Sequence, residues 1–204
     1  MKKVAITGNI GSGKSWVCQL FESLGIPVFY SDSEAKRLYG RPDIRSAMTL
    51  RFGAETYLPD GSLNKPYLSS LIFSDASAMA EVERILYPAL NLWFDDWAEA
   101  QDAPYVLYES AIVFEKHLEG RFDAVVMVTA SEATRLRRVL LRDRCDEAAV
   151  RRRMALQWPD DLKCALADFV ILHDHDDEDE ALMRQVGSVH HQLCRSGMGF
   201  MDGK

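Results

Sequence analysis

Residues 8–16 read GNIGSGKSW and place three glycines, a lysine and two serines directly behind a short apolar run. An ordered glycine costs backbone entropy, so such a cluster needs a conformational reason. The spacing from Gly8 to Ser15 is G-x-x-x-x-G-K-S, in which backbone N–H groups curl around phosphate oxygens. The lysine of this pattern reaches the β- and γ-phosphates, and its serine hydroxyl binds Mg²⁺. The pattern therefore predicts binding of a nucleoside triphosphate; the alternative is a plain glycine turn.

The residues that we expect to bind the nucleotide form an almost continuous set. They are Gly8, Gly11, Ser12, Gly13, Lys14, Ser15 and Trp16. We also expect Lys14 to be catalytic, because its charge would neutralise the transferred phosphoryl group. Ser15 is the first expected ligand of Mg²⁺.

Two acids follow predicted strands, at the strand ends where ligands of parallel sheets gather. Asp32 follows the run Ile26–Tyr30, where a carboxylate can accept a proton from an attacking hydroxyl. It could instead cap a helix that begins at Ser33. Glu109 ends the run YVLYE and could hold Mg²⁺ or its water, or simply be a loop acid with protein partners.

Arginine is concentrated in one segment. Residues 135–153 contain eight arginines and three acids, a local charge of +5 in a chain whose net charge is −7. Arginine suits bidentate contacts with phosphate. We therefore favour a phosphate-facing segment over a solvated helix face.

The elements that must position these residues alternate along the chain. We expect strands at Val4–Thr7, Ile26–Tyr30, Tyr105–Tyr108, Ala124–Ala130 and Phe169–Leu172. Short apolar strands separated by helices predict an α/β fold, with a five-stranded parallel sheet covered by helices on both faces.

The interval between Asp32 and Gln101 contains no clear buried strand and is expected to be helical. The segment 57–66, YLPDGSLNKP, should form turns within it. Spacing along a later helix predicts an apolar core stripe, made of Leu86, Leu90, Trp93 and Trp97.

The acidic run HDHDDEDE, residues 173–180, raises the question of a metal site. It lacks the glycine and the closing glutamate of a calcium loop. We interpret it as a loop followed by the first turn of a helix, where acids interact favourably with the helix dipole.

Composition excludes several classes of protein. A net charge of −7 disfavours general binding to nucleic acid. No apolar run has the roughly 18 residues of a transmembrane helix, and the N-terminus does not resemble a signal peptide. The four cysteines are scattered without a C-x-x-C pair, as is typical of a reducing cytoplasm. We therefore expect a cytoplasmic protein with no membrane partner.

The ordered motifs between about residues 4 and 172 resemble those of the dephospho-CoA kinase family. The family's opening, a strand followed by G-G-I-G-S-G-K-S, matches with Asn9 at the second glycine. Its D-A-D element is similar to residues 30–32, and its D-G-x-L-x-R segment to residues 60–65. Its H-P, P-L-L-F-E, arginine-bearing lid and last strand resemble residues 87–88, 111–115, 135–157 and 166–171. Tyr30, Lys65 and Tyr87 depart from the family's pattern, which bears on substrate contacts.

The resemblance implies that ATP, with Mg²⁺, phosphorylates the ribose 3′-hydroxyl of 3′-dephospho-CoA, giving ADP and CoA in the last step of coenzyme A biosynthesis. It also implies Asp32 as the catalytic base. Arg138 and Arg142, four residues apart on one helix face, are the lid residues that we expect to contact phosphate.

The expected organisation has three parts. Residues 1–31, 101–133 and 158–204 form a nucleotide-binding core, residues 32–100 a helical insertion that binds the CoA substrate, and residues 134–157 the lid. The expected partner is a small molecule, and the expected assembly a monomer or small homo-oligomer. One alternative is another small-molecule kinase, of the nucleoside monophosphate or shikimate type. A nucleotide-dependent switch is a further alternative, although the guanine-reading N-K-x-D motif is absent from the sequence.

Overall fold

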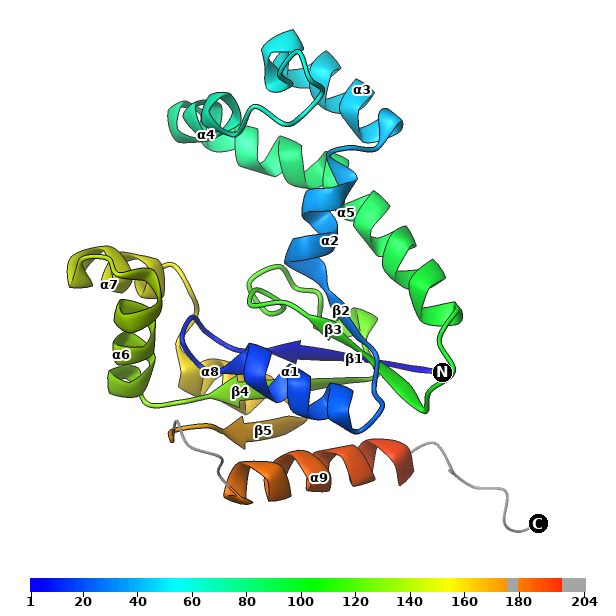
Figure 1. Ribbon diagram of the computed structural model, residues 1–204, viewed down its shortest axis with the longest axis vertical. Helices are drawn as coiled ribbons and strands as arrows, with labels where there is room; N and C mark the ends of the chain where they lie inside the picture. Colours follow the sequence, from blue (N-terminus) through cyan, green and yellow to red (C-terminus); the bar gives the residue numbers. More distant parts are fainter. Residues whose placement is uncertain (176–179, 196–204) are drawn as a thin grey trace. The chain divides into compact units, whose positions relative to one another are not determined.

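The computed structural model of the chain describes residues 1–175 and 180–195 (Figure 1). These residues divide into two compact units. The first comprises the described residues of Met1–Phe29 and Gln101–Lys204, and the second comprises Tyr30–Ala100. The second unit is therefore an insertion in the sequence of the first.

The first unit contains a five-stranded sheet (Figure 1). Its strands are β1 (Lys2–Thr7), β2 (Val28–Tyr30), β3 (Tyr105–Glu109), β4 (Ala124–Thr129) and β5 (Phe169–Leu172). Their order is β2-β3-β1-β4-β5, and β1 pairs in parallel with both β3 and β4, as β4 does with β5. The predicted strands and the α/β fold are confirmed.

Strand β2 starts later than predicted, at Val28 instead of Ile26. The reason lies in Pro27, which has no N–H and cannot donate to a neighbouring strand. Its carbonyl oxygen does accept a hydrogen bond from the Leu107 amide, at 2.9 Å. Pro27 therefore lies just before the first residue of β2.

The central strand β1 is buried on both of its faces. Val4, Ala5 and Ile6 are all fully buried, although successive side chains of a strand point to opposite sides. Ala5 packs in a cluster with Val113 and Phe114. Helix α1 contacts β1 and β4, and helix α9 contacts α1 and β5. This burial explains why the strand sequence is a continuous apolar run.

The helices of the first unit lie between its strands in the sequence, and the last helix follows the last strand. They are α1 (Lys14–Ser23), α6 (Glu132–Asp143), α7 (Glu147–Ala155), α8 (Asp160–Leu166), α9 (Glu180–Arg195) and the 3₁₀ turn η2 (Glu119–Arg121). Helix α1 buries Val17, Cys18 and Phe21. Throughout the described part of the chain, no helix has both the length and the apolar character needed to cross a membrane.

The second unit is helical, as predicted. Its elements are α2 (Ser31–Leu38), α3 (Pro42–Phe52), the 3₁₀ turn η1 (Ala54–Thr56), α4 (Lys65–Ser74) and α5 (Ala76–Glu99). Helices α2, α3 and α4 all contact α5. The predicted turn segment contains an isolated bridge between Tyr57 and Leu63, and the Asn64 side chain then caps α4.

The apolar stripe of α5 is only partly as predicted. Leu86 and Leu90 are buried, but the stripe continues through Phe94 and Ala98. Trp93 is 40% exposed, and its indole N–H donates to the Glu34 carboxylate at 2.9 Å. The prediction of Trp93 as a core residue is wrong: the buried positions follow one another in steps of four residues from Leu86 to Ala98, and Trp93 lies beside them.

The start of the acidic run forms a loop after β5. The His173 amide donates to the Thr129 carbonyl at 2.8 Å, and the Asp174 carboxylate accepts from the Ser131 amide at 2.8 Å. Residues 176–179 lie outside the described residues, and α9 begins at Glu180. Asp174 thereby connects this loop to the N-cap of α6.

Candidate nucleotide-binding site

A glycine-rich loop connects β1 to α1; residues 8–15 are called the phosphate loop below. Gly11 and Gly13 have φ values of 81° and 84°, in the left-handed region that favours glycine. A Cβ at Gly8 would collide with the Val128 carbonyl oxygen on β4. Two of these glycines are thus required by backbone conformation, and Gly8 by close approach.

The first turn of α1 grows directly out of this loop. Gly13 is the N-cap residue, and its carbonyl accepts hydrogen bonds from the Trp16 and Val17 amides at 3.0 and 3.2 Å. Ser15 and Trp16 are exposed at this helix start, whereas Ser12 is buried. The N-terminal end of a helix is electropositive, which favours an anion here.

Lys14 and Glu109 form an ion pair. The sheet explains why they meet, because Glu109 ends β3 in register with Ile6, two residues before the loop begins. Their side chains are only 12% and 10% exposed. Sequence reasoning placed each residue near phosphate but did not predict that they pair.

The oxygen donors near the loop fit a magnesium ion. Mg²⁺ takes few protein ligands, with water and phosphate oxygens completing its coordination. The Ser15 hydroxyl and the Glu109 carboxylate supply donors of this type. Among the described residues, no group of three or more His, Cys, Asp or Glu side chains forms a metal-binding cluster.

One turn beyond Lys14, Cys18 is buried inside α1. Burial raises the pKa of its thiol to about 12, although the charge of Lys14 acts in the opposite direction. The thiolate is the reactive form of cysteine, so this side chain is an inert part of the core.

The segment predicted as a lid, residues 134–157, comprises most of α6, then α7 and the two residues after it. Arg138 donates to the carbonyls of His173 and His175, at 2.9 and 2.8 Å, and reaches the Gly11 carbonyl at 3.4 Å. Arg142 is paired with the neighbouring Asp143 at 2.7 Å. Protein atoms thus hold both arginines that the sequence indicated, and their contact with phosphate stays a prediction.

Asp32 is an exposed residue in the first turn of α2, in the second unit. Helix α2 begins at Ser31, and its N-cap residue is Tyr30, which makes no side-chain cap. The alternative that Asp32 caps a helix beginning at Ser33 is therefore wrong. Its role as a base stays a prediction, supported by its place directly after β2.

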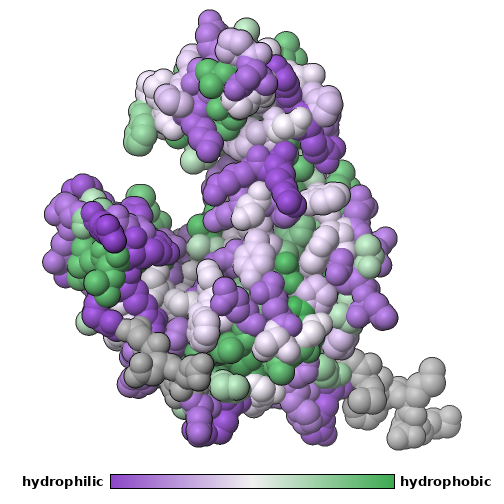
Figure 2. Space-filling view, viewed as in Figure 1, coloured by the Kyte–Doolittle hydropathy of each residue, from purple (hydrophilic) through white to green (hydrophobic). Residues whose placement is uncertain are grey.

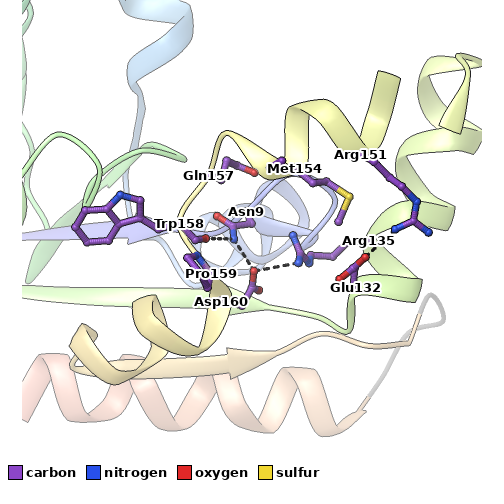
Figure 3. A pocket seen from close by; sticks show the side chains of 10 residues that line it. Asn9, Glu132, Arg135, Arg151, Met154, Gln157, Trp158, Pro159 and Asp160 are labelled. Atoms are coloured by element: carbon purple, nitrogen blue, oxygen red, sulfur yellow. Dashed lines mark hydrogen bonds and ion pairs between the residues drawn. The ribbon is translucent and has the colours of Figure 1, made fainter. Parts of the chain in front are cut away.

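A cavity of about 460 Å³ lies beside the phosphate loop (Figure 3). It is lined by Asn9, Glu132, Arg135, Arg151, Met154, Ala155, Gln157, Trp158, Pro159 and Asp160. The arginines in this lining are Arg135 and Arg151, and neither is one of the two that the sequence had indicated. The lining of the cavity therefore comes from the phosphate loop, α6, α7 and the segment that leads into α8.

Sequence reasoning missed a buried polar cluster behind this cavity. Lys163, on α8, is fully buried, and its ammonium donates to the Asn9 side-chain oxygen at 2.7 Å and to the Ala111 carbonyl at 3.1 Å. It also pairs with Glu115 at 2.5 Å. The only sequence signal was Asn9 itself, which stands where the family's pattern has glycine.

Comparison with known proteins identifies the family. A family model described as dephospho-CoA kinase matches residues 2–179. The chain belongs to the dephospho-CoA kinase family. The dephospho-CoA kinase of Syntrophotalea carbinolica is 40% identical over 177 residues, which cover 84% of this chain and 83% of that relative.

Solved structures share the fold of this chain. TT1252 from Thermus thermophilus is 31% identical, with a TM-score of 0.81 over 94% of this chain and 97% of its own. The dephospho-CoA kinase from Campylobacter jejuni has a TM-score of 0.68 over 96% and 98% of the two chains. At 18% identity this second likeness shows the shared fold alone.

Proposed function

We propose that this chain is a dephospho-CoA kinase, which transfers the γ-phosphate of ATP to the ribose 3′-hydroxyl of 3′-dephospho-CoA and yields ADP and CoA. This is the last step of coenzyme A biosynthesis. The observation that carries the proposal is the family match over residues 2–179, together with the phosphate loop inside it.

The phosphate loop supports binding of ATP. Backbone N–H groups from Gly8 to Trp16 would face the phosphates, and the positive end of α1 would lie against them. Lys14 would exchange its ion pair with Glu109 for contacts with the β- and γ-phosphates. Phosphoryl transfer is accelerated mainly by positioning and electrostatic stabilisation, and Lys14 supplies the latter.

Ser15 and Glu109 would hold Mg²⁺. When bound, the ion would neutralise charge that develops on the phosphates during transfer. Glu109 would then be released from Lys14, since each side chain takes a new partner of opposite charge.

The acceptor hydroxyl would lie against Asp32, which orients it and takes its proton late in the transfer. The insertion at residues 32–100 would bind the rest of dephospho-CoA. The lid, with Arg138 and Arg142, would close over the phosphates and exclude water that otherwise hydrolyses ATP.

We place the enzyme in the cytoplasm, as a monomer or small homo-oligomer acting on a small molecule. The four cysteines support this location, since all of them are free thiols.

A coupled assay of ADP release tests the function. The purified chain is given ATP and Mg²⁺ with dephospho-CoA, AMP, CMP or shikimate in turn. We expect turnover that depends on dephospho-CoA alone. Turnover with AMP, CMP or shikimate instead would identify a different small-molecule kinase, and no acceptor-dependent turnover would indicate a switch.

A further inference from the structure

The chain that leaves the lid is attached to the first half of the phosphate loop (Figure 3). Between α7 and α8, the Trp158 carbonyl accepts a hydrogen bond from the Asn9 side-chain amide at 2.9 Å. The Gln157 side-chain oxygen accepts one from the Ile10 backbone amide at 2.8 Å. Two consecutive loop residues therefore hold the exit of the lid.

The chain that enters the lid is held at the same place. One oxygen of Asp160 accepts from the Asn9 amide at 2.5 Å and pairs with Arg135, in the first turn of α6, at 3.1 Å (Figure 3). Its other oxygen accepts from the Thr129 hydroxyl, at the end of β4, at 2.6 Å. The Arg135 carbonyl also packs directly against Gly11. Both ends of the lid thus meet the loop through Asp160 and its neighbours.

The orientation of the Asn9 side chain is fixed by charges on both sides. Its oxygen faces the ammonium of Lys163 at 2.7 Å, and its NH₂ group faces the Asp160 carboxylate. An amide turned the other way would place donor against donor and acceptor against acceptor. Asn9 is only 4% exposed, so these charge-assisted hydrogen bonds compete little with water.

We propose that Asn9 is a positioning residue, which couples the phosphate loop to both ends of the lid so that loop and lid hold the nucleotide as one unit. The proposal builds on the proposed function. A glycine, which the family's pattern has here, could make none of these side-chain contacts. Misplacement of a reacting group by 1 Å can cost about 10²-fold in rate, so a rigid link of this kind acts on kcat more than on KM.

A swap of the two partners tests the link. Asn9→Asp places a second carboxylate beside Asp160, and Asp160→Asn removes the charge that Asn9 and Arg135 share. Each single variant should lower kcat for dephospho-CoA about 10- to 100-fold, as loss of a hydrogen bond to a charged group does, with a smaller change in KM for ATP. The double variant restores an amide and a carboxylate in reversed positions, with the new carboxylate still facing Lys163. Its kcat should exceed that of either single variant; additive losses would overturn the proposal.

A second measurement needs no acceptor and therefore separates this proposal from the proposed function. Binding of ATP should slow hydrogen exchange in both the phosphate loop and residues 134–157 of the wild-type chain. In Asn9→Asp, bound ATP should protect the loop but not the lid, and the double variant should regain lid protection. Lid protection equal to wild type in Asn9→Asp would refute the coupling, whichever acceptor the enzyme uses.

Two further variants control for stability. Asn9→Gly removes the side-chain bonds without adding a charge, and it should lose lid protection even if Asn9→Asp does not fold. Tyr105→Phe removes a partly buried hydrogen bond of 2.9 Å to His190 in the same unit. It should lower Tm and leave kcat unchanged, whereas an equal fall in kcat would assign the Asn9 effect to general destabilisation.

Discussion

Lys14 stands directly after the last glycine of the phosphate loop, and its partner Glu109 is 7% exposed. We expect Lys14→Ala to lower kcat at least ~10²-fold, as removal of one preorganised electrostatic group does. The measurement is ADP release that depends on dephospho-CoA, with Tm recorded because the variant leaves Glu109 buried without its ion partner. Near-normal turnover by the folded variant would remove Lys14 from the mechanism.

The effect of changing Asp32 would distinguish a kinase from a protein that only binds ATP. We expect Asp32→Asn to retain Tm and ATP affinity but to lose ~10²–10⁴-fold in acceptor phosphorylation, the usual effect of removing a general base. Since Tyr30 is the N-cap of α2, a capping role cannot produce this loss.

Asp43→Asn is a matched control for Asp32. Asp43 is likewise an acid in the first turn of a helix of the same unit, and it is paired with Arg41. This variant should keep full activity. Full activity of Asp32→Asn as well would rule out the base assignment.

For single residues, the sequence predicts function well where the functional residues are close together in the chain. Gly8, Gly13 and Lys14 lie within one short segment, so their spacing alone predicts a phosphate loop. The partners of Asn9 are not local: Trp158 and Lys163 are 149 and 154 residues away. Side-chain pairing at such separation depends on the folded sheet and leaves no periodic pattern.

Helices α6 and α7 contact one another and make up most of the predicted lid, residues 134–157. Their surface in Figure 2 is mainly hydrophilic, as the arginine content requires. We expect ATP and dephospho-CoA together to protect residues 134–157 from proteolysis and hydrogen exchange more than either does alone, because each ligand contributes to closure. Equal protection with and without ligands would contradict a mobile lid.

The junction of these two helices should respond to acid. Hydrogen bonds from Arg142 and Arg153 lower the pKa of the Asp143 carboxyl from 3.8 to about 2. A depressed pKa means that this carboxylate stabilises the fold above about pH 4, and that its contribution is lost as the pH falls toward 2. Asp143→Asn should therefore lower Tm at pH 5 but make no difference near pH 2. A Tm difference that stays constant over this range would contradict the assignment.

Whether a segment is a helix or a strand was predictable, because burial leaves a pattern in the sequence. The first residue of a strand and the buried face of a helix were less predictable. The strand prediction succeeded for β1 because residues buried on both faces must be apolar. It placed the start of β2 two residues too early, because the missing N–H of Pro27 outweighs local hydrophobicity. Trp93 was misplaced because an aromatic side chain can lie beside a core stripe and hydrogen-bond at the surface.

At the scale of the molecule, the sequence of the first unit is interrupted by the second unit. The insertion Tyr30–Ala100 separates β2 from β3, although these strands are neighbours in the sheet. Sequence reasoning could find the helical stretch from its lack of buried strands. It could not order the strands, because that order depends on pairings between distant segments.

This layout has a consequence for how the protein is made. Strand β1 is synthesised before the other four strands of the sheet, yet it lies at the centre, between β3 and β4. Its partners begin only at Tyr105 and Ala124, so the nascent strand must wait while about half of the chain is synthesised. Helices of the insertion can form in that interval, whereas the apolar residues of β1 stay uncovered. The unpaired strand therefore exposes apolar surface during synthesis, the condition in which aggregation competes with folding.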